Sequence, residues 1–349
     1  MKIVIATTYV PFIKGGGTMI IDSLQEQLVK RGFETDIAWF PLLSLWRELP
    51  KQTLAMRLLD LTESSGNLID RVITVRYPSY AVKHPNKVAW FIHHHRGAYD
   101  LFGTEFQDLP DTDEGHKVRS MMLKYDTHYL KEHRYIYTNS KIVARRLKQF
   151  NDIDADAVVY PPLPNAKQFY KGDYGDYFLY TSRISTIKRQ ILAVEAMRHV
   201  KSNFRLVLAG KGDTQEQEDM LRAQIERYGL KNRITITGWV SEEEKIRLTA
   251  NAYGCLYIPF DEDSYGYPTL EAFQSNKPVI TCTDSGGTDE IIENGVNGLI
   301  CNPKPEAIAA AMEALWQDRK RINEYGENAF ASLKQHNIDW DNVIEKMTR

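Results

Sequence analysis

Residues 254–273 read GCLYIPFDEDSYGYPTLEAF, which indicates a strand, a loop and a helix in direct succession. The apolar run 254–260 is typical of a buried strand, and Pro268 is well placed to begin the following helix. In open α/β sheets the loops after the carboxyl ends of the strands form the ligand crevice. This order places Asp263 in a crevice loop and Glu271 near the start of a helix. The two acids are either a catalytic or ligand-binding pair, or residues that only complement the helix dipole.

The same alternation of strand and helix continues in both directions. In the first half, a strand over residues 2–10 leads into three glycines at 15–17, and apolar residues then recur at helical spacing up to Gly32. In the second half, strands are expected at 177–181, 204–209, 234–237, 254–260 and 278–282, with helices between them. Such alternation specifies a parallel sheet with helices on both faces. We therefore expect an α/β protein built from two doubly wound domains.

The length also favours two domains, because 349 residues exceed what one hydrophobic core usually supports. The boundary is expected in the stretch 161–176, which contains three prolines and Gly172 and sustains no helical or strand periodicity. The N-terminal domain should cover residues 1–165, and the C-terminal domain residues 177–328.

Composition and charge describe a folded globular chain. Hydrophobic residues are 43% and charged residues 26% of the sequence, which excludes a disordered or fibrous protein. The formal charge of −2 gives no sign of a nucleic-acid partner. The three cysteines form no C-x-x-C pair, so neither a disulfide framework nor a thiolate metal site is expected. Because no apolar stretch is long enough for a signal peptide or a membrane span, we expect a cytoplasmic protein.

Two other strand-end loops of the second half carry groups suited to an anion. Arg183 and Lys188 follow the strand at 177–181, and a guanidinium fork beside an ammonium group would complement a diphosphate. The loop 283–288 contains two adjacent glycines before a short helix, and it could bring backbone N–H groups close to an anion. Taken singly, these features are equally consistent with solvated cations and an ordinary turn.

In the first half, the strand at 88–92 runs into His93, His94, His95 and Arg96. If the chain stays extended, His93 and His95 share a face and His94 points away. A hydrogen-bonding or acid–base role for one histidine and simple packing are both open. Zinc is disfavoured because no H-E-x-x-H or similar spacing supplies further ligands. A nicotinamide enzyme and a P-loop protein are also disfavoured, since neither G-x-G-x-x-G nor G-K-[ST] is present.

Together these motifs make the sequence resemble the retaining nucleotide-sugar glycosyltransferases of family 4, also described as glycosyl transferases group 1. The resemblance covers nearly the whole chain and is strongest over residues 177–315. Members of this family have the GT-B fold, in which two Rossmann-like domains face each other across a cleft. The ordered motifs that carry the resemblance are Arg183 with Lys188 five residues on, Gly210-Lys211-Gly212, Thr237-Gly238-Trp239-Val240, the span from Asp263 to Glu271, Pro278-Val279-Ile280, Ser285-Gly286-Gly287-Thr288-Asp289-Glu290 and Gly295-Val296-Asn297-Gly298-Leu299.

The resemblance implies roles for residues at matching positions. Arg183 and Lys188 would hold the donor diphosphate, and Glu271 would hydrogen-bond the ribose. The family usually has Glu where Asp263 stands, so the pattern here is D-x7-E rather than E-x7-E. The implied donor-binding residues are Arg183, Lys188, Glu271, Gly16, Gly17, Tyr267, Thr269, Leu270, Gly212 and Val240; the implied catalytic residues are His93 and Asp263; and His95, Arg96, Ser285, Gly286 and Gly287 are further candidates.

The chemistry implied by the resemblance is hexosyl transfer from a nucleotide diphosphate sugar to a hydroxyl of a glycan, glycolipid or small-molecule acceptor, with retention of anomeric configuration. Negative charge develops on the departing phosphate, and preplaced cations and helix N–H groups would stabilise it. No divalent metal or other cofactor is then expected. Such an enzyme would act in the assembly of polysaccharides or glycoconjugates.

Several alternatives stay open at this point. A nucleotide-sugar epimerase, a phosphorylase or a non-catalytic nucleotide-sugar-binding protein could share the fold. The segment 42–61 is either an interfacial segment that would give peripheral contact with the inner face of a membrane, or two helices packed on the first domain. In GT-B proteins a C-terminal helix often crosses back to the first domain, and residues 329–349 would supply it here.

Overall fold

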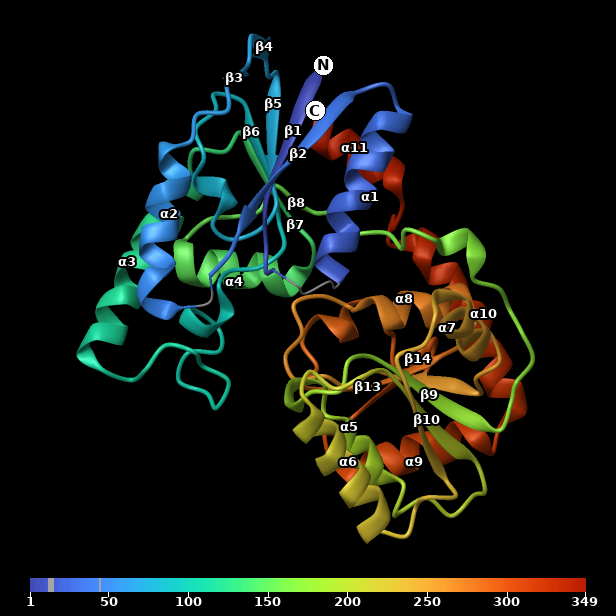
Figure 1. The fold of residues 1–349 in the computed structure, drawn as a ribbon. Coiled ribbons are helices and arrows are strands. Elements are labelled where there is room, and N and C mark those ends of the chain that lie inside the picture. The colour runs from blue at the N-terminus through green and yellow to red at the C-terminus, as the bar shows by residue number, and fades with distance from the viewer. Residues whose placement is uncertain (12–15, 44) are drawn as a thin grey trace. The chain divides into compact units, whose positions relative to one another are not determined.

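The structure, a computed structural model, describes residues 1–11, 16–43 and 45–349. The chain divides into two compact units. Unit 1 comprises Met1–Pro164 together with Ile338–Arg349, and unit 2 comprises Asn165–Asn337. Each unit is built around a six-stranded sheet (Figure 1). Of the C-terminal residues 329–349, which were expected to join the first half, only 338–349 belong to unit 1, and 329–337 belong to unit 2.

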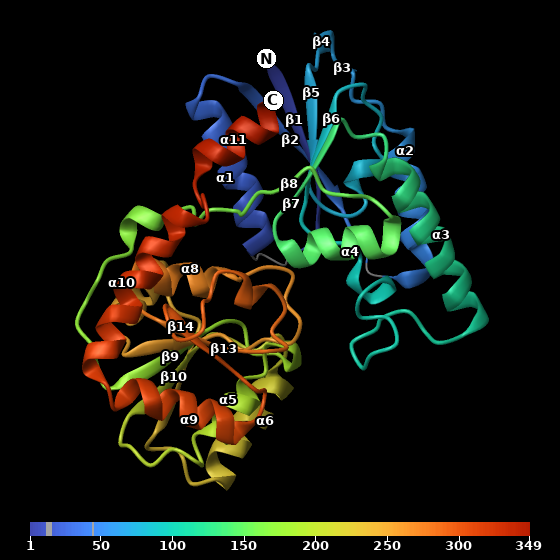
Figure 2. The ribbon, with the colours of Figure 1, turned by 180° about the vertical axis from the view of Figure 1, so that it is seen from behind.

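The sheet of unit 1 has the order β2-β1-β5-β6-β7-β8, and all neighbouring strands are parallel. Helices α1 and α11 lie on one face of this sheet, and α2 and α3 lie on the other (Figures 1 and 2). The elements are β1 Lys2–Tyr9, α1 Gly16–Lys30, β2 Glu34–Pro41, α2 Leu49–Leu58, β3 Glu63–Ser64, β4 Asn67–Leu68, β5 Arg71–Thr74, β6 Lys87–Phe91, α3 Asp113–Leu130, β7 Tyr135–Thr138, α4 Lys141–Asn151, β8 Ala157–Val158 and α11 Trp340–Thr348.

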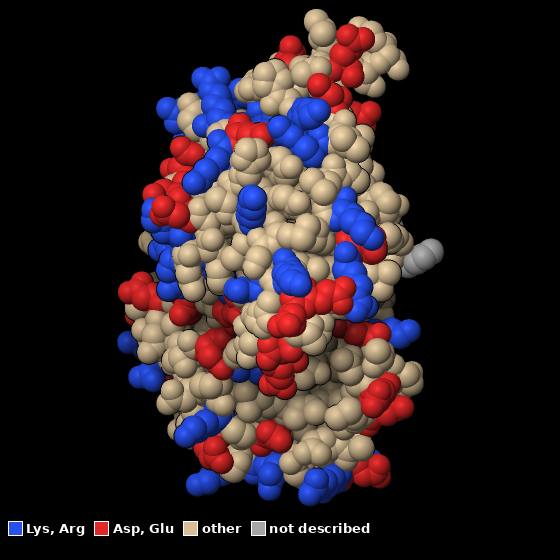
Figure 3. All heavy atoms as spheres, turned by 90° about the vertical axis from the view of Figure 1, so that its left-hand side faces the viewer, with Lys and Arg blue, Asp and Glu red and all other residues tan. Residues whose placement is uncertain are grey.

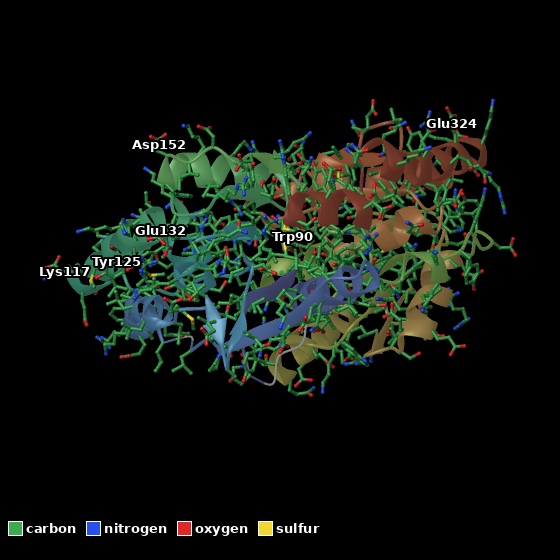
Figure 4. The ribbon with its side chains drawn as sticks, turned by 90° about the horizontal axis from the view of Figure 1, so that it is seen from above. Trp90, Lys117, Tyr125, Glu132, Asp152 and Glu324 are labelled. Atoms are coloured by element: carbon green, nitrogen blue, oxygen red, sulfur yellow. The ribbon has the colours of Figure 1, made fainter. Side chains whose placement is uncertain are left out.

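The C-terminal helix α11 is part of the core of unit 1. All five residues of β6 are buried, as expected for a central strand covered on both faces. Within β6, Trp90 donates to the carbonyl of Val159 at 2.9 Å, and its ring lies edge-on to Trp340 of α11 with 6.4 Å between ring centres. Figure 4 labels Trp90 where the strand passes this helix. A hydrogen bond of 3.0 Å from Arg71 to the carbonyl of Met347 fixes the far end of α11.

The sheet of unit 2 is also entirely parallel, with the order β11-β10-β9-β12-β13-β14. This is the doubly wound order, in which the direction of winding reverses between β9 and β12. Helices α5, α6 and α9 lie on one face, and α7, α8 and α10 lie on the other (Figures 1 and 2). The elements are β9 Tyr177–Thr181, α5 Gln190–Ala196, β10 Arg205–Ala209, α6 Gln215–Arg227, β11 Ile234–Gly238, α7 Glu242–Ala250, β12 Gly254–Leu256, α8 Tyr267–Gln274, β13 Val279–Cys282, β14 Gly298–Cys301, α9 Pro305–Trp316 and α10 Arg319–Gln335.

The prediction of an α/β protein with two doubly wound domains is confirmed, and three local expectations are corrected. The strand expected over 254–260 ends at Leu256, because Pro259 has no N–H group and the N–H of Phe260 instead donates to the carbonyl of Ile187 at 2.7 Å. The helix expected over 329–349 is divided between α10 and α11. Asn337 has a positive φ of 51°, which ends the first helix, and Asp339 caps the second.

The third correction concerns the segment 42–61. Its described residues, 42, 43 and 45–61, contain one α-helix, α2, preceded by a short 3-10 helix at Trp46–Glu48, rather than two full helices. Pro50 lies in the first turn of α2, where proline is tolerated, so it does not interrupt the helix. One side of α2 packs on unit 1 through Leu49 and Met56, while Leu58 on the other side is 79% exposed.

Candidate functional site

The reversal of strand order in unit 2 defines the candidate site. In doubly wound sheets the ligand crevice lies outside the carboxyl ends of the strands at this reversal. The loop after β9 carries Arg183 and Lys188, and the chain after β12 carries Asp263. The two are joined by the backbone hydrogen bond from Phe260 to Ile187. The structure thus brings together two of the strand-end loops that the sequence singled out.

Tyr257 lies at the centre of these charges. Its buried hydroxyl accepts a hydrogen bond from Lys188 Nζ at 2.9 Å and donates to Glu262 Oε2 at 3.0 Å. Lys188 and Glu262 also form a direct ion pair. Burial raises the pKa of the Tyr257 hydroxyl well above its usual value; the negative charges of Glu262 and Glu271 add to this rise, and Arg183 opposes it. Lys188 and Glu262 therefore contact one neutral phenol, on which the charges of Arg183 and Glu271 also act.

Each of the two cations is paired with a carboxylate from a different loop. Arg183 is paired with Asp213, which follows β10, and the arginine side chain is 51% exposed. Lys188 is paired with Glu262 and is only 15% exposed. The sequence analysis missed both partners. Their positions after β10 and β12 were nevertheless a usable signal, because the carboxyl ends of parallel strands meet at one edge of the sheet.

Glu271 lies in α8 and is only 4% exposed. Its carboxylate accepts a hydrogen bond of 2.6 Å from Lys245 of α7, which also pairs with Glu242 at 2.9 Å. Burial raises the pKa of the Glu271 carboxyl, and Lys245 limits this rise. Burial alone would lower the pKa of Lys245, but Glu271 and Glu242 outweigh it and raise that pKa. Lys245 was not predicted from the sequence, although Ser241, with Glu244 three residues later, marks the start of its helix.

The N-terminus of α8 is formed by residues that the resemblance assigns to donor binding. Gly266 caps the helix with a positive φ of 70°, a conformation that favours glycine. The N–H of Thr269 donates to the carbonyl of Gly266 at 3.1 Å, so this donor is used within the turn. Leu270 is buried, and burial raises the pKa of the Tyr267 hydroxyl.

The glycines after β13 have a packing role that the sequence did not reveal. Gly286 has a positive φ of 66°, and a Cβ atom there would clash with the backbone of Glu262. A Cβ on Gly287 would lie 2.8 Å from the Cα of Ser264. The N–H of Gly287 donates to the carbonyl of Glu262 at 2.8 Å, and Ser285 is fully buried. The two glycines therefore bring the loop after β13 against the loop that carries Asp263.

Gly212 and Val240 lie in the loops after the two outer strands, β10 and β11. The N–H of Gly212 donates to Glu218 at 2.7 Å, and a Cβ on Gly212 would lie 2.6 Å from the carbonyl oxygen of Thr214. Val240 is half-buried beside Trp239, whose side chain is 78% exposed. Gly212 is thus required by the local turn, independently of any ligand.

Arg189 is a structural residue of the site that the sequence analysis missed. It has a positive φ of 54° and directly follows Lys188. Its guanidinium donates to Asp284 at 2.7 and 2.8 Å and to the carbonyls of Ile258 and Pro259 at 2.8 and 2.7 Å. One side chain therefore ties together the chain segments after β9, β12 and β13.

In unit 1, the three histidines after β6 alternate as expected. His94 is buried, and His93 and His95 are half-buried. Burial lowers the pKa of His94 to about 4, and its ring is hydrogen-bonded to Asn151 at 2.7 Å. His95 is hydrogen-bonded to Asp108 at 2.8 Å, and His93 Nδ1 lies 2.6 Å from the carbonyl oxygen of His94. His94 is thus a neutral packing residue, while the other two reach the surface of the unit.

Arg96 belongs to a compact charge cluster. It donates to Asp100 at 2.7 Å, and Arg146 of α4 lies 3.3 Å from the same carboxylate. The Asp100 and Arg146 side chains are 8% and 7% exposed. Two guanidinium groups therefore share one buried carboxylate, which lies a few residues after the histidines in the sequence.

The glycine loop of unit 1 is described only in part. Gly16 and Gly17 form the start of α1, and Gly15 lies outside the described residues. A Cβ on Gly17 would clash with the guanidinium of Arg76, which donates to the carbonyl of Thr8 at 3.1 Å. Burial lowers the pKa of Arg76. This arginine was not predicted from the sequence, although it lies two residues after β5, the neighbour of β1, where the strand order of unit 1 reverses.

Residues 1–11, 16–43 and 45–349 contain neither a cluster of side chains that could hold a metal ion nor a membrane-spanning helix. No three His, Cys, Asp or Glu side chains there lie close enough to hold a metal ion. No helix in that part of the chain combines the length and the apolar character needed to cross a bilayer. On the face shown in Figure 3, Lys and Arg are interspersed with Asp and Glu.

Residues 165–332 match the model of the family described as glycosyl transferases group 1. The matched segment lies within unit 2, so it is unit 2 that resembles the group 1 glycosyl transferases. The matched segment includes every residue described above at the switch point of unit 2. D-rhamnosyltransferase WbpZ of Pseudomonas aeruginosa is 28% identical over 161 residues, which are 46% of this chain and 41% of that protein. The matches span less than half the length of this and other curated relatives.

Solved structures extend the likeness of fold to the whole chain. Sucrose-phosphate synthase from Thermosynechococcus elongatus has a TM-score of 0.78 at 18% identity, over 99% of this chain and 97% of that one. Anabaena HepE in complex with UDP and glucose has a TM-score of 0.70 at 16% identity, over 99% of both chains. The fold of the chain is GT-B, as the sequence resemblance implied.

Proposed function

We propose that this chain is a retaining glycosyltransferase that moves a sugar from a nucleotide diphosphate sugar to a hydroxyl of a glycan, glycolipid or small-molecule acceptor. The observation that carries the proposal is the position of Arg183 and Lys188 in the loop after β9, where Lys188 and Glu262 meet at the hydroxyl of Tyr257 beside the switch point of unit 2. The match of the same segment to group 1 glycosyl transferases and the UDP and glucose bound by Anabaena HepE support it.

In this proposal the diphosphate binds to Arg183 and Lys188. Both cations already have carboxylate partners, Asp213 and Glu262. A phosphate oxygen would share or replace these partners, so neither cation is left without a counter-charge before or after binding. When the sugar–phosphate bond breaks, the two cations stabilise the charge that develops on the leaving group. No divalent metal is needed for this step.

Glu271 is proposed to bind the ribose hydroxyls from the second turn of α8. Lys245 would keep its carboxylate ionised and oriented, because it is hydrogen-bonded to one oxygen at 2.6 Å. A second oxygen then remains to accept hydrogen bonds from a diol. A ribose ligand would supply partners for that second oxygen, and a buried polar group without a partner is costly.

Asp263 and His93 are proposed to act near the reacting carbon of the sugar. Attack by the acceptor hydroxyl on the face from which the phosphate departs would retain the anomeric configuration, with the departing phosphate as base. His95 and Arg96 are the alternatives for contact with donor or acceptor. The proposal places this chemistry in the cytoplasm, in the assembly of a polysaccharide or glycoconjugate.

A panel of UDP, GDP and dTDP sugars tests the proposal. The true donor should raise the melting temperature, because a ligand at 100 times its Kd stabilises the folded state by about 2.7 kcal/mol. NMR of the transfer product should show the anomeric configuration of the donor, and activity should persist in EDTA. Lys188→Gln should remove the stabilisation, whereas Lys231→Gln, an exposed cation elsewhere in unit 2, should not. If no nucleotide sugar stabilises the chain, or if the product is inverted, the proposal is wrong.

A further inference from the structure

A cavity of about 280 Å³ opens beside α5 and α6 of unit 2. It is lined by residues 184–186 and 189–192, by Glu195 and by three residues of α6. Arg183, Lys188 and Glu271 are not part of its lining. The cavity is therefore separate from the proposed donor site, although it lies behind the same strand-end loop.

Two buried oxygen atoms of the lining lack a hydrogen-bond partner within the described ranges: Oγ of Ser185 and Oε1 of Gln217. Ser185 is only 8% exposed. An unsatisfied buried polar atom costs about 1–3 kcal/mol, and native structures contain few of them. Less than 1 Å² of each atom is exposed, so a rotation of the Ser185 or Gln217 side chain would bring its oxygen to a donor group of a molecule in the cavity and remove part of this cost.

The remaining wall of the cavity is mainly apolar. Leu221 forms part of the buried wall, and Ile191 and Met220 at the rim are 38% and 55% exposed. Covering exposed apolar side chains is favourable at about 25 cal/mol for each Å² removed from water. A largely apolar ligand that covers the rim would therefore bind with a favourable hydrophobic free energy.

The charged residues of the lining disfavour an anionic ligand. The guanidinium of Arg189 is held by Asp284 at 2.7 and 2.8 Å and by two backbone carbonyls, so its charge is already compensated. Glu195 also lines the cavity and carries a negative charge. An uncharged ligand is therefore the best fit.

We propose that this cavity is a second binding site, which takes an uncharged, mainly apolar molecule with one hydroxyl or amide donor. Its size supports a substituted aromatic ring, because an engineered cavity of about 150 Å³ already binds benzene. The site is independent of the proposed transferase activity, since it rests only on the shape and chemistry of the α5/α6 face.

Calorimetric titration of the whole chain with 4-propylphenol tests the site. The expected result is saturable binding at one site per chain. 4-Propylanisole has nearly the same shape but cannot donate a hydrogen bond, and it should bind about 2- to 12-fold more weakly. In the double variant Ser185→Ala, Gln217→Leu the two probes should bind equally.

Filling variants locate the binding. Met220→Trp adds bulk at the rim and should weaken binding of 4-propylphenol at least tenfold, and Ile191→Trp gives an independent second test. Phe330→Trp is the control, because Phe330 is an exposed apolar residue of α10 on the other face of unit 2. Circular dichroism and melting temperature verify that each variant is folded. Heats that never saturate, or equal binding by both filling variants and the native chain, would overturn the proposal.

Discussion

Replacing Lys245 by Met should reveal what the buried ion pair of unit 2 contributes to stability. In the native chain the Lys245 ammonium donates to Glu271 at 2.6 Å, and the Lys245 and Glu271 side chains are 16% and 5% exposed. Methionine keeps most of the side-chain length and removes the charge, which leaves Glu271 buried without its counter-charge. Breaking a buried pair in this way costs about 3–5 kcal/mol.

Glu271 can lower this cost by taking up a proton. The ordinary pKa of its carboxyl group is 4.5, and protonation therefore costs about 3.4 kcal/mol at pH 7 and about 1.4 kcal/mol at pH 5.5. A carboxyl whose pKa is higher in the folded state makes that state less stable as pH rises between the unfolded and folded pKa values. The loss of stability caused by Lys245→Met should therefore shrink by about 2 kcal/mol when the pH falls from 7 to 5.5.

Urea denaturation of the native chain and the variant at both pH values measures this difference, and hydrogen exchange in α7 and α8 assigns it to unit 2. Lys231→Met is the matched control, because its ion pair with Glu226 is exposed on both sides and contributes at most about 1 kcal/mol. The double variant Lys245→Met, Glu271→Gln should recover much of the loss at pH 7. An equal loss at both pH values would refute the reasoning.

The donor site, the glycine loop and the buried histidine each give one further test. Asp263→Asn should lower kcat by about 10²–10³-fold and Lys188→Gln should chiefly weaken donor binding; unchanged kinetics in both folded variants would contradict the proposed roles. Gly286→Ala should lower the free energy of unfolding by about 1–3 kcal/mol because of its positive φ and the clash with the backbone of Glu262, and urea denaturation with no loss would show that the two loops can separate. Since the pKa of His94 is lowered from 6.5 to about 4, stability should fall by up to about 3.4 kcal/mol as the pH drops through this window. His94→Gln should flatten this part of the measured pH profile, and an unchanged profile would assign it to other groups.

The fold could be predicted from the sequence because its signals are local. Short apolar runs that alternate with amphipathic segments identify parallel sheets before any long-range contact is known. The errors arose where a tertiary contact decides the boundary. The N–H of Phe260 donates to the carbonyl of Ile187, which is distant in sequence, and does not extend the strand pairing of β12. The helix break at Asn337 likewise depends on a left-handed residue that periodicity does not reveal.

The candidate site was predictable in its strand-end loops and in the helix that carries Glu271. Arg183, Lys188 and Asp263 follow strands, and the order of strands is enough to gather them at one edge. Their partners were not predictable in the same way, because Lys245 reaches Glu271 from a different helix. Periodicity locates a helix but not the neighbour that its side chains meet.

Gly286 and Gly287 are a second case in which the sequence did not reveal a tertiary contact. The sequence indicated an anion-binding turn, whereas the structure gives a packing reason: a Cβ at these positions would meet the backbone of the loop at 261–264. That loop lies more than twenty residues earlier in the chain. A pair of adjacent glycines indicates that another segment of the chain packs closely against it, but it does not identify that segment.

The discontinuous composition of unit 1 has a consequence for biosynthesis. Trp90 packs against Trp340, so the core of unit 1 needs a helix that is translated about 180 residues after Pro164. At roughly 5–20 residues per second, the ribosome supplies α11 only about 10–35 s later. During that interval the complete sequence of unit 2 emerges and can fold first. A denatured chain placed in buffer has all its segments at once, so the order of events on the ribosome and in refolding should differ.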